Sequence, residues 1–431
     1  MILTNARILT FDAANRVLDS GSVEVNSDGA IGFVRGGSAL GRNVIDLDGG
    51  LLMPALINCH THLYSTLARG MRLGGPPPAD FSSILKKLWW RLDRALNDED
   101  VYYSALAGLI DSARCGVGTV IDHHSSPCAC AGSLDAIERA FREVGLRGAT
   151  CYEVSDRNGK RAAEDGIREN VRFLERTSPG AQVGAMFGLH ASFTLGDRTL
   201  RACLEANQSL RAGFHVHVAE DRCDRGAVRR LVEFGALDEK SIAAHCVHVS
   251  AAERAMLGRR HVNVVHNPQS NCNNAVGIAD LPALFRRSVC VGLGSDGCSP
   301  RMWDEFKTAY HLQKVRARDP RAAGAEAFAA AFSNNREIVN KIWGVSVGRI
   351  EPGAKADLLL LDYQPPTPIH SANLFGHLLS GIANAAVRSL MVNGQWVVRG
   401  GQCTQLDERR AAEHAAARAK ALWERLGKKN L

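Results

Sequence analysis

The chain has 431 residues, of which 45% are hydrophobic and 23% are charged, a composition typical of globular proteins with a large core. Its formal charge of +7 comes from 52 Lys and Arg residues against 45 Asp and Glu residues, and no basic run is interleaved with aromatic residues. This distribution argues against nucleic-acid binding. The 12 cysteines are too sparse for a disulfide scaffold and favour reduced thiols in a cytoplasmic protein.

The start of the chain does not resemble a signal peptide, because MILTNARILTFDAANR lacks a charged leader followed by a long apolar region. Apolar runs such as Leu358 to Leu361 are too short to span a bilayer. We therefore expect a cytoplasmic protein that contacts neither membranes nor nucleic acids.

Both ends of the chain carry β-strand patterns. Residues 1–50 alternate short apolar and polar pieces, separated by Asn, Asp and Gly turns. A similar pattern returns in residues 348–405, where Asn393-Gly394 lies between two apolar pieces and predicts a hairpin. We expect these two segments to form one small β-sandwich domain. Residues 406–431 are rich in Ala and Arg and predict an amphipathic C-terminal helix.

The middle segment, residues 51–347, alternates short β-branched strands with helical stretches, as in a parallel sheet or barrel. We expect strands at 51–57, 119–122, 146–151, 183–189, 213–218, 241–245, 262–265 and 289–294. About eight strand–helix repeats favour a closed (β/α)8 TIM-like barrel over an open sheet. The predicted fold class is α/β, with this barrel joined to the small β-sandwich domain.

Polar side chains collect where the predicted barrel strands end, which is the rim where barrel enzymes carry their chemistry. His60 and His62 follow the first strand, and alternation along an extended chain places both on one face. Later strands end in further histidines, which are His123, His124, His190, His215, His217, His245 and His266. Asp296 follows the eighth strand. Histidines scattered by chance would not gather at one rim.

Three imidazoles and one carboxylate are a familiar ligand set for catalytic zinc, with water completing the coordination sphere. We assign four ligands, which are His60, His62, His217 and Asp296. His215 shares a strand face with His217, so spacing alone does not separate the two. The acid at Glu220 favours His217 as the ligand, and His215 is then a buried neighbour of the ligands.

Catalytic roles follow from this ligand set. A metal of this kind makes water acidic enough to supply hydroxide near pH 7, and Asp296 could receive the released proton. Glu220 could carry protons to the substrate nitrogen that leaves, and His245 could hydrogen-bond to the attacking oxygen. His190 would face the substrate. The simpler interpretations are a solvated loop acid for Glu220 and core histidines for His245 and His190.

Together these motifs resemble the amidohydrolase superfamily. The resemblance rests on Pro54-x-x-Ile-Asn-x-His60-x-His62, His217-x-x-Glu220, the strand-ending His245, His266-Asn-Pro-x-Ser-Asn271 and Gly294-Ser-Asp296-Gly. More narrowly, the chain resembles the aminohydrolase group of triazine hydrolase, guanine deaminase and adenosylhomocysteine deaminase. Segments 88–93 and 267–277 are most similar to the SsnA-type aminohydrolases associated with selenium and purine metabolism.

The resemblance implies one divalent metal ion, usually zinc and sometimes iron. No Lys follows the fourth strand, where two-metal relatives carry a carbamylated bridge, and His190 there matches a substrate-contacting histidine of one-metal relatives. The loop after the first strand covers the pocket in relatives, so Trp89 or Trp90 would stack on a flat ring, unless both belong to a helix core. By analogy alone, we also expect a homodimer or a larger homo-oligomer.

The sequence therefore predicts a metal-dependent hydrolase that deaminates a small amino-substituted nitrogen heterocycle, such as a purine or a pterin. One alternative keeps the site but changes the bond, either by opening a cyclic amide in purine breakdown or by hydrolysing a triazine-like ring. Another alternative is a catalytically silent barrel that acts as a binding protein. The pattern does not fix the substrate, the native metal or the oligomeric state.

Overall fold

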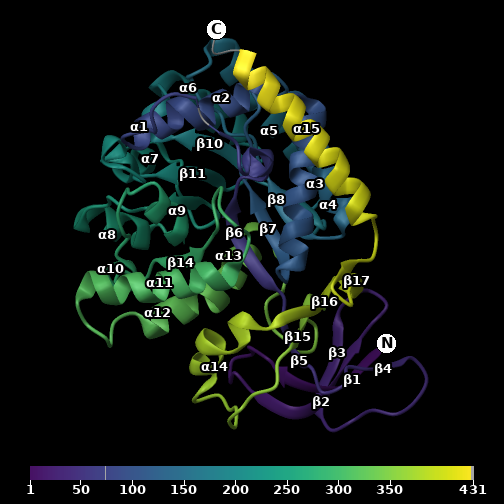
Figure 1. Ribbon diagram of the computed structural model, residues 1–431. Helices are drawn as coiled ribbons and strands as arrows, with labels where there is room; N and C mark the ends of the chain where they lie inside the picture. Colours follow the sequence, from purple (N-terminus) through teal and green to yellow (C-terminus); the bar gives the residue numbers. More distant parts are fainter. Residues whose placement is uncertain (73, 429–431) are drawn as a thin grey trace.

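The computed structural model describes residues 1–72 and 74–428 of the chain (Figure 1). Their strands form three hydrogen-bonded sheets, one built from both ends of the chain and two from its middle. Figure 1 shows the sheet of the chain ends at one side of the molecule, with most helices gathered at the other. The structure is thus of mixed α/β class, as the sequence predicts.

The terminal sheet has nine strands, in the order β18-β17-β16-β15-β5-β1-β2-β3, with β4 paired to β1. Their bounds are β1 Ile2–Leu9, β2 Val17–Val25, β3 Ile31–Gly36, β4 Val44–Asp46, β5 Leu51–Pro54, β15 Leu358–Asp362, β16 Ala386–Val392, β17 Gln395–Arg399 and β18 Gln402–Cys403. The two ends of the chain meet where β5 pairs antiparallel with β15. Because these hydrogen bonds define a single sheet, the expected β-sandwich stays a prediction.

The predicted hairpin near the end of the chain is confirmed. Strands β16 and β17 pair antiparallel on either side of Asn393-Gly394. Both turn residues have positive φ, at 50° and 74°, which suits a two-residue turn that follows the right-handed twist of the strands.

The middle of the chain forms two parallel sheets. The four-stranded sheet contains β6 Leu56–Thr61, β7 Val117–Asp122, β8 Arg147–Thr150 and β9 Val183–Ala185. The five-stranded sheet contains β10 Phe187–Ala191, β11 Phe214–Val218, β12 Ile242–His245, β13 Asn263–His266 and β14 Cys290–Leu293. Nearly every residue of these strands is buried, as expected for parallel strands covered by helices on one side and packed against each other on the other.

Backbone hydrogen bonds also join the two parallel sheets to each other. After β14, the amides of Ser295 and Asp296 donate to the carbonyl of His60 in β6, at 3.0 and 2.9 Å. At the opposite edge of the five-stranded sheet, the amide of Val154, which follows β8, donates to the carbonyl of Gly188 in β10 at 3.1 Å. The amide of His190 in β10 donates to the carbonyl of Val154 at 2.9 Å. Both junctions lie where the strands end, so the side chains that follow the strands are brought to a common rim.

Two predicted strands are divided in the structure. The segment 51–57 forms β5, which joins the terminal sheet, and then β6, which joins the parallel sheet, with only Ala55 between them. The segment 183–189 is divided into β9 and β10 at Met186. A continuous apolar run does not reveal where a strand changes its partner, because every residue of β5 and β6 is buried. The other six predicted segments each overlap one strand of the parallel sheets.

Helices lie between consecutive strands of the parallel sheets, except between β9 and β10, which Met186 alone separates. They are α3 Asp98–Arg114, α4 Ser133–Val144, α5 Lys160–Arg176, α6 Asp197–Asn207, α7 Ala227–Phe234, α8 Ala251–Arg259, α9 Pro268–Asn273 and α10 Leu281–Phe285, and after β14 come α11 Met302–Ala317, α12 Gly324–Phe328, α13 Asn335–Trp343 and α14 Leu374–Ser380. In α4, Leu134, Ile137 and Phe141 are buried at helical spacing, so one stripe of the helix faces the core. No helix within residues 1–72 and 74–428 has the length and apolar character that crossing a membrane requires.

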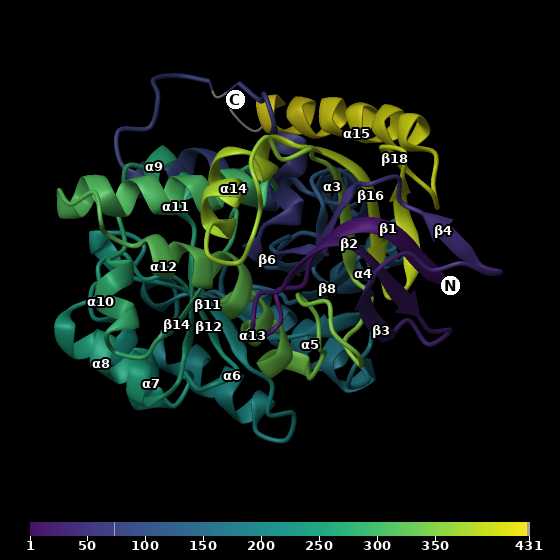
Figure 2. The ribbon, with the colours of Figure 1, turned by 90° about the horizontal axis from the view of Figure 1, so that it is seen from below.

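The C-terminal helix α15, Glu408–Lys428, lies along α3 in both views (Figures 1 and 2). Two of its arginines, Arg418 and Arg425, pair with the buried carboxylate of Asp100 in the first turn of α3. The helix begins at Glu408, close to the predicted start at residue 406. Residues 429–431 of the predicted helix lie outside the described residues.

A candidate metal-dependent active site

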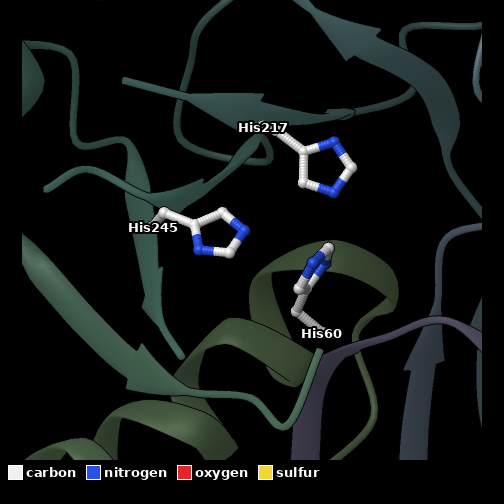
Figure 3. A group of neighbouring side chains, drawn as sticks. All are labelled: His60, His217 and His245. Carbon is white, nitrogen blue, oxygen red and sulfur yellow. The ribbon is translucent and has the colours of Figure 1, made fainter. Parts of the chain in front are cut away.

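The residues assigned to the metal come from four places on the common rim. His60 belongs to β6 and His62 follows it, His217 belongs to β11, and Asp296 follows β14. All four are buried or nearly so. Figure 3 shows the rings of His60 and His217, together with that of His245 from β12, directed toward a shared space.

The hydrogen bonds of His62 and His217 fix which ring nitrogens face this space. Nδ1 of His62 donates to the carbonyl of His123, and Nδ1 of His217 donates to the carbonyl of His190, both at 2.7 Å. In a neutral ring, Nε2 then carries a lone pair, and the two Nε2 atoms lie only 3.1 Å apart. Two lone pairs that face each other repel, and a cation or a proton between them removes the repulsion.

Asp296 adds a negative charge at the same point. Its Oδ1 lies 3.0 Å from Nε2 of His62 and 3.8 Å from Nε2 of His60. Burial opposes ionisation of Asp296, yet the hydrogen bond and charge of His62 hold the pKa of its carboxyl far below the usual range. Burial alone would lower the pKa of His62, but Asp296 raises it to about 9. The ring therefore takes up a proton in the place that a metal cation would fill.

His60 completes a donor set that fits a divalent ion. Its Nδ1 is hydrogen-bonded to Nε2 of His215 at 2.8 Å, and its buried Nε2 has no hydrogen-bond partner among the described residues. An unsatisfied buried nitrogen that faces two lone pairs and a carboxylate is suited to a metal ion rather than to water. His215, the alternative to His217, lies behind His60 and makes this supporting contact, as a buried neighbour of the ligands would.

Glu220 and His245 lie beside the four candidate ligands. Nε2 of His245 is 3.5 Å from Oε2 of Glu220 and 3.6 Å from Oδ2 of Asp296. Burial raises the pKa of Glu220 to about 7, and the charge of Asp296 acts in the same direction. Asn271 accepts a hydrogen bond from Nδ1 of His245 at 2.8 Å, which directs Nε2 toward the two carboxylates. His245 itself has a φ of 74°, a strained conformation for a non-glycine residue that often occurs at active sites.

A cavity of about 850 Å³, part of it open to solvent, lies over these groups. His62, His217, Glu220 and Asp296 are part of its lining. The segment after β6 contributes its aromatic wall through η1 Leu63–Ala68, α1 Phe81–Ile84, the π-helical turn η2 Leu85–Trp89 and α2 Trp90–Leu92, and η3 Asp93–Ala95 follows outside the lining. Such π-helical turns are frequent at functional sites.

The predicted substrate contacts also lie at this cavity. Trp89 and Trp90 both line it, and both also pack against a buried hydrophobic cluster that contains Phe81 and Leu85. His190 lines the cavity as well, with its ring centroid 6.3 Å from that of Trp90. Burial lowers the pKa of His190 to about 3, so its ring is neutral near pH 7.

Several residues at the site were not singled out from the sequence. Glu153 and Arg157 line the cavity, Ser270 donates to Oδ2 of Asp296, and Asn274 donates to Glu220 at 3.3 Å. Glu153 follows the third strand of the parallel sheet, so the same strand-end rule that found the histidines could have found it. Ser270 and Asn274 lie within the segment 267–277 that carries part of the family resemblance, but their partners depend on the fold.

Comparison with known proteins assigns the chain to a family. A sequence model described as "Amidohydrolase family" matches residues 51–397, well over half of the chain. The chain belongs to the amidohydrolase family. This result confirms the resemblance drawn from the histidine and aspartate motifs.

Curated relatives of this amidohydrolase cover nearly its whole length. A 5-methylthioadenosine/S-adenosylhomocysteine deaminase of Desulforudis audaxviator is 30% identical over 402 residues, which cover 88% of this chain and 89% of the relative. A 5'-deoxyadenosine deaminase of Methanosarcina mazei is 30% identical over 445 residues, 99% of each chain. Among solved structures, an adenosine deaminase of Xanthomonas campestris with bound zinc has a TM-score of 0.84 at 22% identity, and the match covers 99% of this chain and 98% of that one. At this identity the structural match shows a shared fold.

Proposed function

We propose that this amidohydrolase removes the amino group from a small nitrogen heterocycle, a purine or a pterin. In this reaction water adds to the ring carbon that bears the amine, the exocyclic C–N bond breaks, and the nitrogen departs as ammonia with the proton it gains. Two observations support the proposal, namely the acid–histidine pair beside the candidate ligands and the relatives that are named as deaminases of adenosine derivatives.

We further propose one divalent metal ion, zinc first and iron as the alternative, held by His60, His62, His217 and Asp296. When bound, such an ion acts as a Lewis acid that makes water a nucleophile near pH 7. The chemistry of the donor set supports this assignment, because three imidazole nitrogens and one carboxylate match known catalytic zinc sites. The zinc in the Xanthomonas structure belongs to that protein.

The remaining groups take the roles that their contacts suit. Glu220, with a pKa near 7, can accept a proton and deliver it to the ring nitrogen of the substrate. His245 can hydrogen-bond to the attacking oxygen through the nitrogen that faces Glu220 and Asp296. Asp296 would receive a proton from water. His190 and either Trp89 or Trp90 would hold the flat ring.

The same proposal includes the architecture. The two parallel sheets, joined at both edges by backbone hydrogen bonds, would form one (β/α)8 barrel from residues 51–347. Residues 1–50 and 348–405 would form the small β-domain, and residues 406–431 the C-terminal helix. Strand β5 lies in the barrel portion of this division but pairs with the terminal sheet. A cytoplasmic location and a homo-oligomer likewise stay predictions.

The paired Nε2 atoms of His62 and His217 beside Asp296 carry the metal assignment, on which the proposed reaction depends. Its test is metal analysis of the purified protein, followed by an ammonia-release screen over purines, pterins and triazines. We expect one equivalent of zinc or iron and ammonia from a purine or pterin without loss of ring absorbance. Ring loss without ammonia would favour the ring-opening alternative, and a protein that binds no transition metal would overturn the proposal.

Asp296→Asn provides a direct test of the ligand set. The substitution keeps the size of the side chain but removes the charge that offsets the cation, so we expect loss of the metal and of activity together. Asp221→Asn is the matched control, because Asp221 lines the same cavity but makes no contact with the candidate ligands. Retention of both metal and activity in Asp296→Asn would remove Asp296 from the site.

A further inference from the structure

A second group of charged side chains lines the same cavity, away from the assigned metal ligands. Glu153 is 4% exposed and lies on the cavity wall together with the largely buried Arg157. Arg157 donates through Nη2 to Oε1 of Glu153 and pairs through Nη1 with Oδ2 of Asp93 at 2.6 Å. Asp93 is 1% exposed and does not line the cavity. One guanidinium therefore serves two buried carboxylates.

This cluster has more acceptors than donors. Oδ1 of Asp93 has no hydrogen-bond partner within the described part of the chain. Oε2 of Glu153 lies 3.3 Å from Nδ1 of His123, and each carboxylate oxygen can accept more than one hydrogen bond. Burial opposes ionisation of Glu153, but the guanidinium of Arg157 helps to hold the pKa of its carboxyl well below the usual range. The wall thus presents a fixed negative charge and free acceptor capacity to the cavity.

His190 adds a second acceptor beside Glu153. The hydroxyl of Thr194 donates to the carbonyl of Ala191 at 3.0 Å, so its oxygen accepts the hydrogen bond from Nδ1 of His190 at 2.8 Å. In the neutral ring, Nε2 of His190 is then an acceptor. One nitrogen of His190, one nitrogen of His217 and a carboxylate oxygen of Glu153 all lie within 4.8 Å of one another.

The closeness of Glu153 to His217 determines which part of a substrate it meets. His217 belongs to the candidate ligand set, next to which the reacting ring carbon must lie. A carboxylate within 4.8 Å of that histidine reaches the ring itself, or atoms directly attached to it, rather than a distant substituent. A ring edge that carries only acceptor nitrogens would face the acceptor oxygens of this buried carboxylate with no hydrogen between them, which is unfavourable.

We propose that Glu153 is a specificity-determining residue that accepts a hydrogen bond from a ring N–H next to the carbon under attack. This inference rests on the proposed deaminase function and narrows its substrate class. The favoured substrates are lactam-type amino heterocycles such as guanine and pterin, whose ring N–H adjoins the amino-bearing carbon. The adenine ring of a nucleoside has no N–H apart from the departing amine, and it is disfavoured.

The test compares kcat/KM for guanine, pterin and 5'-deoxyadenosine in the metal-loaded wild-type protein and in Glu153→Gln. Gln keeps an acceptor for Arg157 but removes the charge. We expect the wild type to favour guanine or pterin over 5'-deoxyadenosine by about tenfold or more, the scale on which one unsatisfied buried polar group weakens an interaction. Glu153→Gln should reduce that ratio by about tenfold, mainly through KM, with metal content unchanged.

Asp93→Asn is the matched control, because it changes the other carboxylate on Arg157 and leaves the cavity wall intact. A purely structural role of the cluster would change all substrates equally in both variants, and that result would overturn the proposal. If Glu153→Gln does not fold, Glu153→Asp withdraws the carboxylate by one methylene and should change the same ratio. A wild type that prefers 5'-deoxyadenosine, with a kcat/KM ratio that these substitutions do not change, would also overturn the role of Glu153. That result would leave the proposed deaminase function intact.

Release of no ammonia from any of these heterocycles would count against the proposed function instead. The specificity inference is then tested by equilibrium binding of guanine, followed through the fluorescence of the cavity tryptophans Trp89 and Trp90. We expect Glu153→Gln to bind guanine about tenfold more weakly than the wild type. Equal binding by the two proteins would overturn the role of Glu153.

Discussion

Glu220 shows how its surroundings adapt a single side chain for proton transfer. It is buried at the cavity, its carboxyl lies 3.5 Å from His245, and burial raises its pKa to about 7. Near neutral pH the carboxyl is therefore present in both protonation states, which suits a group that accepts a proton and then delivers it. An exposed loop acid would lack this property.

Glu220→Gln should separate proton transfer from metal binding. Gln fits the same space and can still interact with Asn274, but it cannot carry a proton at this position. We expect kcat to fall by about 100-fold or more while the metal content stays at the wild-type level. Ammonia release and metal analysis of the same preparation measure both quantities. An active variant would exclude Glu220 as the proton carrier.

The buried carboxyl of Glu305 in α11 should make the stability of the folded protein depend on pH. Its side chain is fully buried, Gln269 donates a backbone hydrogen bond to it at 3.1 Å, and burial raises its pKa from 4.5 to about 8. Because the folded pKa lies above the unfolded one, the stabilising contribution is complete below pH 4.5 and is lost as the pH rises to about 8. The free energy of unfolding should fall by roughly 1.4 kcal/mol per pH unit from this group across that window.

Glu305→Gln should remove this loss, because the amide stays neutral at every pH. We expect the difference in free energy of unfolding between the variant and the wild type to shift in favour of the variant from pH 5 to pH 8, as measured by urea denaturation. The control is Glu233→Gln, since Glu233 is exposed and should leave the pH dependence unchanged. A constant difference between Glu305→Gln and the wild type across this range would contradict the prediction.

At the scale of elements, helix α15 contacts η1, which lines the cavity, and η3, which directly follows the aromatic wall of the cavity in the sequence. Its Trp423 donates through Nε1 to the carbonyl of Leu67 in η1, at 2.8 Å, and Arg425 donates to the carbonyl of Ala95 in η3, at 3.1 Å. Both segments belong to the stretch between His62 and α3 that carries Trp89 and Trp90. The last helix of the chain therefore supports the covering of the cavity from outside.

Asp100→Asn tests this docking. The Asp100 carboxylate is fully buried and pairs with Arg418 and Arg425, so its loss removes charge-assisted hydrogen bonds between α3 and α15. We expect the free energy of unfolding to fall by about 2 kcal/mol. Asp98→Asn is the matched control in the same helical turn, because Asp98 is exposed and should cost less than about 0.5 kcal/mol. Equal effects in the two variants would count against the docking contact.

How much of the site the sequence predicts differs from residue to residue. The sequence predicts His60, His62, His217 and Asp296 together, because metal chemistry needs their side-chain types and strand ends place them on one rim. The sequence does not predict the division of residues 51–61 into β5 and β6, because residues 51–57 form one apolar run across the boundary. The Asp93–Arg157–Glu153 cluster depends on contacts between distant segments, which periodicity does not contain.

At the scale of the whole molecule, one buried ion pair joins the parallel sheets to the terminal sheet. Arg147 in β8 donates to both carboxylate oxygens of Asp357, which directly precedes β15, at 2.8 and 3.2 Å. Each side chain is only 2% exposed. Asp357 also accepts a hydrogen bond from the amide of Asn393 in the β16–β17 turn, at 2.7 Å. A single bidentate contact thus links strands that lie far apart in the sequence.

Arg147→Met should destabilise the protein strongly, because it leaves the buried carboxylate of Asp357 without its counter-ion. We expect a loss of about 3–5 kcal/mol in the free energy of unfolding, and partial recovery when Asp357→Asn is added. Arg69→Met is the control, since the exposed Arg69–Asp111 pair should contribute less than about 1 kcal/mol. Urea denaturation measures all three variants, and equal losses for Arg147→Met and Arg69→Met would contradict this role.

The single residue between β5 and β6 has a mechanical consequence. Ala55 alone connects β5, which pairs with β15, to β6, which carries His60, so no flexible linker separates the two strands. The amide of Ala55 also donates to the carbonyl of Asp357 at 2.9 Å. A joint this short transmits displacement instead of absorbing it, so the outer sheet and the histidine-bearing strand should move as one body. We therefore expect the pocket to open by rearrangement of the short turns between His62 and α3, and not by a swing of one half of the molecule against the other.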